Sequence, residues 1–143
     1  MLVVFVDFDG VLHRAGNGLE HVGPHFLWLP ILSRALAAHP DVVLAVHSTW
    51  RYQYSITELR ELQASPAPRT ITAVPRGPRA EAIRWLLQMN PLVTEYRVLD
   101  DDLDEFDPPP DELLLCDPSM GITTPGIIGL LTTWLEQTKP ALP

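Results

Sequence analysis

Short apolar runs that each end at a polar residue constrain the fold of this chain most strongly. The clearest runs are Leu2–Val6, Val42–His47 and Tyr96–Leu99, and the residues that follow them are Asp7, Ser48 and Asp100. Continuous apolar runs of this length are typical of strands that are buried on both faces of a parallel sheet. Ligands of open parallel sheets bind beyond the carboxyl ends of the strands. We therefore expect the three polar residues to converge on one site.

Helical patterns separate the apolar runs. The predicted helices are Trp28–Ala38, a capped helix from Ser55 to about Ala64, the amphipathic segment Arg79–Met89, and a last helix capped by Thr124 with Pro125 in its first position. Two more strands are predicted at Thr70–Val74 and Leu113–Cys116, and residues 10–27 read as irregular. This alternation predicts an α/β fold with a mainly parallel five-stranded sheet flanked by helices.

The 143 residues predict a single domain, 1–143, which is long enough to bury a core without disulfides. Cys116 is the one cysteine, so an internal disulfide and a Cys-rich zinc site are excluded, and we expect a buried thiol. The apolar runs fall far short of the ~20 residues of a membrane span. Asp7 and Asp9 interrupt the first run before a signal-peptide core can form. These features predict a cytoplasmic protein without a membrane partner.

Negative charge is concentrated in one segment. The chain has 18 acidic and 10 basic residues, and eight of the acids lie in residues 100–112, which contain no Lys or Arg. The remaining ten acids balance the ten bases, so a broad basic surface for a long nucleic acid is not expected. A small or terminal phosphate can still bind to local donors. The acidic segment is either a solvated loop or a source of ligands for a hard cation such as Mg²⁺.

Asp7 and Asp9 form the sharpest chemical motif, D-F-D-G, directly after the first predicted strand. One carboxylate can attack phosphorus and form an aspartyl phosphate. The other can donate a proton to the leaving group and later activate water. Gly10 permits the backbone to turn tightly beside a phosphate. The alternative is an ordinary turn, because Asp and Gly are common there.

The segment Ser48-Thr49-Trp50-Arg51 follows the second predicted strand. The Ser48 hydroxyl and neighbouring N–H groups, including that of Thr49, can hold a phosphoryl oxygen, although a helix-entry hydroxyl is the simpler alternative. Trp50 can stack on a base or pack in the core. Arg51 can bind a second phosphate or a carboxylate.

A basic residue and two acids complete the candidate site. Arg79 opens a helix and can neutralise a transferring phosphoryl group, with Arg76 as the competitor for that role. Asp100 and Asp101 can bind Mg²⁺ together with Asp7, because crowded carboxylates at a strand end are costly unless they are paired or metal-bound. The five histidines lack a metal-binding spacing and are expected to be loop or core residues.

The order of these motifs resembles the haloacid dehalogenase (HAD) superfamily of phosphotransferases. The first motif looks like Val4–Leu12, the second position is Ser48, the third is Arg79, and the acidic fourth motif is Leu99-Asp100-Asp101. The segments HSTWR and DPSMGITTP, and the Arg-x-x-x-Ile-x-x-Leu helix start, are similar to small HAD domains linked to Swiss Army Knife RNA-repair proteins. Arg79 departs from the lysine that many members have at the third position.

The resemblance implies a Rossmann-like HAD core with the first strand at its centre and the second and fourth strands beside it. It implies that Asp7 is the nucleophile and a Mg²⁺ ligand, and that Asp9 is the general acid/base with its backbone carbonyl on the metal. Ser48 and Arg79 would bind the phosphoryl group, and Asp100 and Asp101 would complete the metal site.

The resemblance also bears on the substrate. The gaps between the motifs, about 40 and 30 residues, leave no room for a large cap domain. An open site would admit a phosphomonoester on a bulky partner, such as a nucleotide or an RNA or DNA end. Two alternatives stay open: a receiver-like regulatory domain, and a noncatalytic module that keeps affinity for Mg²⁺ and phosphate.

Overall fold

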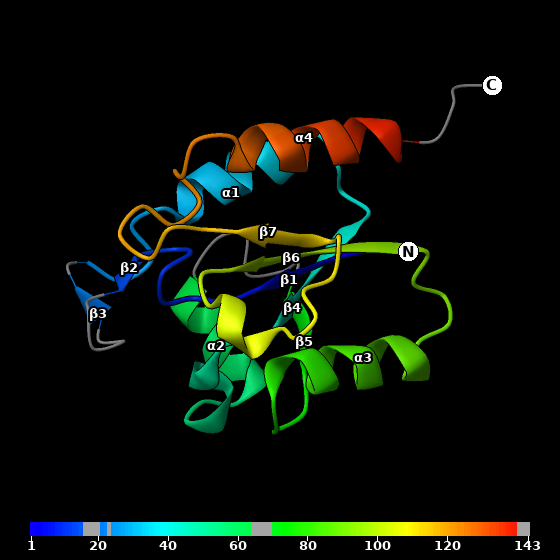
Figure 1. Ribbon diagram of the computed structural model, residues 1–143, viewed down its shortest axis with the longest axis horizontal. Helices are drawn as coiled ribbons and strands as arrows, with labels where there is room; N and C mark the ends of the chain where they lie inside the picture. The colour runs from blue at the N-terminus through cyan, green and yellow to red at the C-terminus, as the bar shows by residue number, and fades with distance from the viewer. Residues whose placement is uncertain (16–20, 23, 64–69, 140–143) are drawn as a thin grey trace.

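A five-stranded sheet lies at the centre of the computed structural model, which describes residues 1–15, 21–22, 24–63 and 70–139 (Figure 1). The spatial order is β5 (Thr70–Ala73), β4 (Val42–Val46), β1 (Leu2–Val6), β6 (Glu95–Asp100) and β7 (Leu113–Leu115). Every neighbouring pair is parallel. The predicted fold class is confirmed, and β1 is the central strand with β4 and β6 beside it.

Helices cover both faces of this sheet (Figure 1). Because side chains alternate along a strand, Val4 and Val6 of β1 join one buried core and Val3 and Phe5 join another. The first core also contains side chains of α1 (Leu29–Leu36) and α4 (Ile127–Gln137), and the second contains side chains of α3 (Arg79–Met89). Burial on both faces explains why β1 reads as an unbroken apolar run.

The connections between strands position the site. The described part of the β1–β4 segment contains the antiparallel pair β2 (Arg14–Ala15) and β3 (His21–Val22) and then α1. The expectation that residues 10–27 are irregular is therefore wrong for β2 and β3. The β4–β6 segment contains the 3₁₀ helix η1 (Thr49–Tyr52), α2 (Ile56–Gln63), β5 and α3. These elements leave no inserted cap domain among the described residues of either segment.

Helix boundaries test the capping predictions. The Ser55 hydroxyl accepts the Glu58 N–H and the Glu58 carboxylate accepts the Ser55 N–H, so the capping box of α2 is confirmed. The predicted last helix is present as α4, but its predicted cap is wrong, because α4 begins at Ile127 and Gly126 is its N-cap with φ of +90°. The Thr124 hydroxyl instead accepts the Asp117 N–H within the preceding turn. No helix of the described segments is long and apolar enough to cross a bilayer.

Candidate active site

Five of the predicted site residues line one hollow at the carboxyl ends of the strands. The hollow has a volume of about 150 Å³, and its walls are formed by Asp7, Asp9, Ala15, Thr49, Arg79, Asp101, Asp102 and Glu105. Register explains the convergence of β1 and β6, because Val6 pairs with Leu99 and the next residue on each strand is an aspartate. The Asp7 N–H donates to the Leu99 carbonyl at 3.1 Å, which continues the ladder to the site.

Three carboxylates lie close together at the base of the hollow; Asp7 and Asp101 line it, and Asp100 is fully buried. One oxygen of each of Asp7, Asp100 and Asp101 lies within 4.8 Å of the others. Asp7 is 2% exposed, and its burial, together with the charge of Asp100, raises the pKa of its carboxyl well above the usual value. Burial and the same neighbour raise the pKa of Asp101 to about 6. Full ionisation of the three carboxylates is therefore unfavourable unless a cation is bound among them.

Arg79 supplies positive charge to this cluster from the first position of α3. Its Nη1 donates to Asp7 Oδ2 at 3.2 Å and to the two oxygens of Asp100 at 2.9 and 3.0 Å. The two carboxylates raise the pKa of the guanidinium above its usual value although burial acts in the opposite direction. Arg76 is exposed, and it donates to the Tyr52 carbonyl at 3.2 Å. Of the two candidate arginines, Arg79 is the one that contacts the site.

His47 is a site residue that sequence reasoning missed. It is fully buried at the end of β4, and its Nε2 lies 2.7 Å from Asp100 Oδ2. Burial lowers the pKa of His47, so the ring is neutral and Nε2 carries the donated proton. Burial alone would raise the pKa of Asp100, but the His47 hydrogen bond and the Arg79 charge outweigh it, and the pKa is lowered. Asp100 is thus held as the ionised member of the cluster.

The carboxylate cluster fits a hard divalent cation. Mg²⁺ takes oxygen ligands and is usually bound through one or two carboxylates and several waters. Asp7, Asp100 and Asp101 offer three oxygens within one ion's reach. Burial and repulsion from Asp100 raise the pKa values of Asp7 and Asp101, and the charge of Arg79 offsets only part of this rise. A dication at this point would remove that repulsion.

Asp9 lies two residues beyond Asp7 in a different environment. Its side chain is 24% exposed, and its two oxygens accept from different rings. His13 Nε2 lies 2.6 Å from Oδ1, and Trp50 Nε1 donates to Oδ2 at 2.9 Å. Both of these partners are aromatic rings, whereas the partner of Asp7 is the Arg79 guanidinium. His13 is fully buried, and like His47 it was expected to have no role in the site.

The β4 loop places its hydroxyl residues at different depths. Ser48 is fully buried, and its Oγ accepts the Trp50 N–H at 3.2 Å as the N-cap of η1. Thr49 is exposed and lines the hollow. The helix-entry arrangement of Ser48 is therefore present, and the hydroxyl proton can still be donated to a ligand.

Arg51, which the sequence offers as a ligand for a second phosphate, is not exposed. Its side chain is buried, 9% exposed, and its guanidinium donates to the main-chain carbonyls of four residues in the surrounding loops, His47, Ser48, Pro75 and Gly77. A guanidinium that already satisfies four carbonyls ties the loops together and is not presented to a substrate. Trp50 is half-buried, and its ring packs at steep angles against Phe8, His25 and Phe26.

Gly10 explains why the D-F-D-G turn needs glycine. Its φ is +77°, which disfavours any residue with a Cβ, and a Cβ built there would collide with the carboxylate of Asp101. The first motif and the fourth motif therefore approach each other through this glycine.

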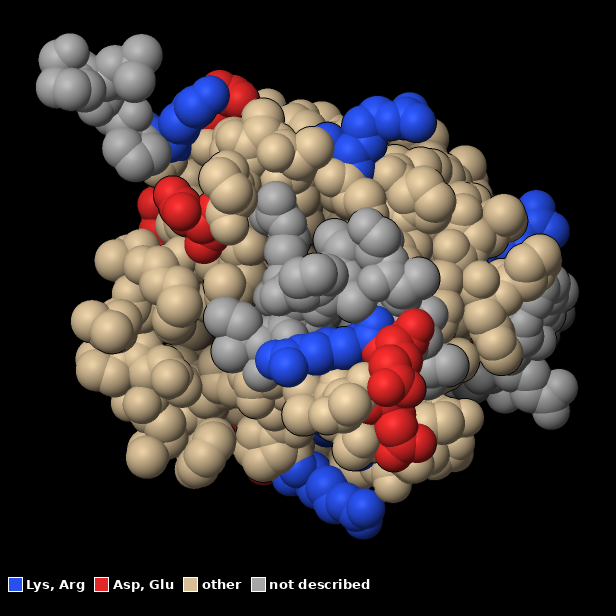
Figure 2. Space-filling view, turned by 180° about the vertical axis from the view of Figure 1, so that it is seen from behind, with Lys and Arg blue, Asp and Glu red and all other residues tan. Residues whose placement is uncertain are grey.

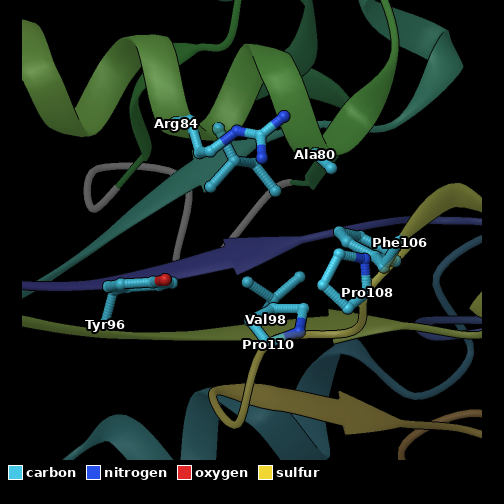
Figure 3. A pocket seen from close by; sticks show the side chains of 8 residues that line it. Ala80, Arg84, Tyr96, Val98, Phe106, Pro108 and Pro110 are labelled. Carbon is cyan, nitrogen blue, oxygen red and sulfur yellow. The ribbon is translucent and has the colours of Figure 1, made fainter.

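A second hollow, of about 110 Å³, lies between α3, β6 and the loop that follows Phe106 (Figure 3). Tyr96 and Val98 form its sheet side, Arg84 lies on its helix side, and Pro108 and Pro110 lie across from the helix. None of the predicted site residues lines it, and it contains no acidic side chain. The candidate active site is therefore the acidic hollow.

Comparison with known families decides the relationship. Residues 3–127 match the family described as the HAD domain in Swiss Army Knife RNA repair proteins. The chain belongs to this family. The match covers β1, β4, α3 and β6, which carry the four HAD motifs, so the resemblance predicted from the sequence is confirmed. No curated protein and no solved structure matches the chain.

Proposed function

We propose that this HAD domain is a Mg²⁺-dependent phosphatase that cleaves accessible phosphomonoesters through an aspartyl-phosphate intermediate on Asp7. The observation that carries the proposal is the position of the Asp7 carboxylate, which lies at the floor of a hollow beside Asp100, Asp101 and Arg79. Asp7, Asp100 and Asp101, with the backbone carbonyl of Asp9, would hold Mg²⁺. When bound, the ion supplies positive charge that offsets the charge of the phosphoryl oxygens.

The chain's own residues account for two displacements at phosphorus. In the first, an Asp7 oxygen forms a bond to phosphorus while the bond to the leaving oxygen breaks, and Asp9 gives that oxygen a proton. In the second, Asp9 takes a proton from water while the water oxygen bonds to phosphorus and the bond to Asp7 breaks. The products are an alcohol and inorganic phosphate, and both aspartates return to their initial states.

Arg79 and the β4 loop would bind the phosphoryl oxygens. The Arg79 Nε is buried and has no hydrogen-bond partner among the described residues, so a phosphoryl oxygen in the hollow would satisfy a donor that is otherwise orphaned. Ser48 and Thr49, at the start of η1, would donate to the same oxygens. We do not include Arg51, because the loop carbonyls already use its guanidinium.

The surface supports a terminal phosphate rather than an extended polyanion as the substrate. Asp101, Asp102 and Glu105 form one wall of the hollow and would repel a strand that runs along it. On the face seen in Figure 2, Lys and Arg side chains of the described residues stand apart from one another, and some of them lie against Asp or Glu side chains. The family's name places such domains in RNA repair proteins, so a nucleotide or the end of an RNA or DNA chain is the substrate class to test first.

The test is phosphate release from nucleotides, phosphopeptides and 3′- or 5′-phosphorylated oligonucleotides, with Mg²⁺ or with EDTA. We expect turnover that requires Mg²⁺ and disappears in Asp7→Asn. Asp104→Asn, which removes an exposed acid from the same loop region, is the matched control and should keep parental activity. Mg²⁺-dependent activity that survives in Asp7→Asn would overturn the proposal.

One observation favours a second candidate, a module that binds Mg²⁺ and phosphate without turnover. Arg79 Nη1 donates to Asp7 Oδ2, so the proposed nucleophile is already engaged by a cation. This candidate predicts that titration calorimetry detects Mg²⁺ and phosphate binding while none of the substrates releases phosphate. Release of phosphate in the same series would exclude it.

A further inference from the structure

Two aromatic residues, His13 and Trp50, hold the side chain of Asp9. The His13 ring contacts Oδ1 at 2.6 Å and the Trp50 indole N–H contacts Oδ2 at 2.9 Å. A carboxylate has about four acceptor positions, and these two donors use one position on each oxygen. We propose that His13 and Trp50 are positioning residues that fix the orientation of Asp9 for proton transfer. The inference rests on the proposed phosphatase function.

The backbone of Phe26 sets the proton position on His13. The Phe26 N–H donates to His13 Nδ1 at 3.0 Å, so Nδ1 is an acceptor and the ring proton lies on Nε2, where it is donated to Asp9. Phe26 has φ of +56°, a conformation that bulky residues rarely adopt. This strained residue, just before α1, aims its N–H at the histidine. A strained backbone conformation at Phe26 therefore accompanies the hydrogen bond that orients the His13 ring toward Asp9.

Packing fixes the second donor. The Trp50 ring lies 5.5 Å from the rings of both Phe8 and Phe26 and 5.7 Å from that of His13. Phe8 is the residue between the two aspartates and is fully buried. The indole therefore has little room to rotate away from Asp9, and the two donors act on one rigid carboxylate. The geometry distinguishes Asp9 from Asp7, whose partner is a guanidinium.

Leaving-group dependence gives a readout that a merely structural role would not move. A poor leaving group, such as the alkoxide of an alkyl phosphate, needs a proton from Asp9, whereas p-nitrophenolate leaves without one. In Trp50→Phe, which removes the N–H and keeps an aromatic ring, the rate constant of the first displacement, read from the burst of alcohol release, should fall about tenfold for the alkyl phosphate. With p-nitrophenyl phosphate, the same rate constant should change by less than about twofold. His13→Ala should show the same selective loss, and His13→Gln, which restores a side-chain donor, should recover part of it.

The matched control is Trp134→Phe. Trp134 is a buried tryptophan of α4, 3% exposed, whose Nε1 has no hydrogen-bond partner among the described residues. This variant loses ring packing but no contact with Asp9, so the ratio of the two first-displacement rate constants should stay at the parental value. Equal losses on both substrates in Trp50→Phe, or no loss on either, would overturn the positioning role.

A measurement without turnover separates this inference from the proposed phosphatase activity. In ¹H–¹⁵N spectra, the indole N–H of Trp50 should shift when Asp9 becomes Ala and should stay in place when Asp104 becomes Asn. The Trp134 indole should not respond to either change. If the parent hydrolyses neither substrate, the proposed function fails, while the indole shift still decides the contact. An unmoved Trp50 signal in Asp9→Ala would contradict the hydrogen bond between the Trp50 indole and Asp9.

Discussion

Asp7 and Asp9 are separated by one residue, yet the fold gives them opposite surroundings. Asp7 is 2% exposed and lies among two other carboxylates and the Arg79 guanidinium. The Asp9 side chain is 24% exposed and is held by the rings of His13 and Trp50. On an extended backbone, side chains two positions apart point to the same face, so the sequence alone does not distinguish the two aspartates. In the proposed mechanism these surroundings suit different roles, with charge handled at Asp7 and proton transfer at Asp9.

The largest expected effect comes from removing each carboxylate in turn. Asp7→Asn should lower kcat/KM by at least about 10³-fold for every leaving group, because no nucleophilic charge remains. Asp9→Asn should lose a similar factor with alkyl phosphates and much less with p-nitrophenyl phosphate in the first displacement. Burst kinetics on both substrates measures this difference. The same dependence of rate on the leaving group in both variants would contradict different roles for Asp7 and Asp9.

Arg79 tests the electrostatic side of the comparison. Arg79→Ala leaves buried carboxylates without their cation and should lower the free energy of unfolding by about 3 kcal/mol in metal-free buffer. Arg76→Ala, which removes an exposed arginine three residues earlier, should change it by less than about 0.5 kcal/mol. Urea titrations of both variants provide the measurement. Similar losses from the two substitutions would show that Arg79 does not neutralise the cluster.

Glycine substitutions test how closely the two motif loops approach. Gly10→Ala places a Cβ against the Asp101 carboxylate at φ of +77° and should cost about 1–2 kcal/mol of stability while weakening Mg²⁺ binding. Gly129→Ala is the matched change in α4, where nothing lies within 4 Å of the added Cβ. It should raise stability by about 0.5–1 kcal/mol through helix propensity. Thermal melts and calorimetric Mg²⁺ titrations check both; tight Mg²⁺ binding in Gly10→Ala would contradict the close approach.

The smallest effect is a pH dependence of stability. Asp7 and Asp101 have raised pKa values in the folded protein, that of Asp101 being about 6, against about 3.9 in an unfolded chain. Their contribution to stability is present below the unfolded value and is lost as pH rises through the folded values. Mg²⁺ competes with these protons. Adding Mg²⁺ should therefore raise the free energy of unfolding by about 1 kcal/mol more at pH 7 than at pH 5, and thermal melts at both pH values should show the larger gain in Tm at pH 7. A gain that is equal at both pH values would contradict a cation site made of these acids.

Much of the fold could be predicted because its signals are local. β1 and α3 begin and end where the apolar run and the amphipathic pattern place them. The meeting of Asp7 with Asp100 also followed from sequence, since parallel strands bring their carboxyl ends to one edge. The helix cap at Thr124 was wrong, because that hydroxyl is used inside the turn that begins at Asp117.

The parts that could not be predicted depend on distant partners. Arg51 is buried by the carbonyls of Pro75 and Gly77, which lie 24 and 26 residues further along the chain. His47 finds Asp100 across 53 residues. His13 lies only four residues from Asp9, but the chain there is a turn, so helical periodicity gives no signal for that contact. The role of a buried histidine depends on the partners of its two ring nitrogens, and the sequence does not give those partners.

In the proposed mechanism Asp7, and not Asp9, carries the phosphoryl group. Asp9→Asn protein should be mixed with Mg²⁺ and p-nitrophenyl phosphate, quenched in acid and digested, and the peptides weighed by mass spectrometry. We expect one added phosphoryl group on the peptide of residues 1–14, located on Asp7, and none when Asp7 is also changed to Asn. Release of p-nitrophenol without any such adduct, or an adduct on His13, would contradict it.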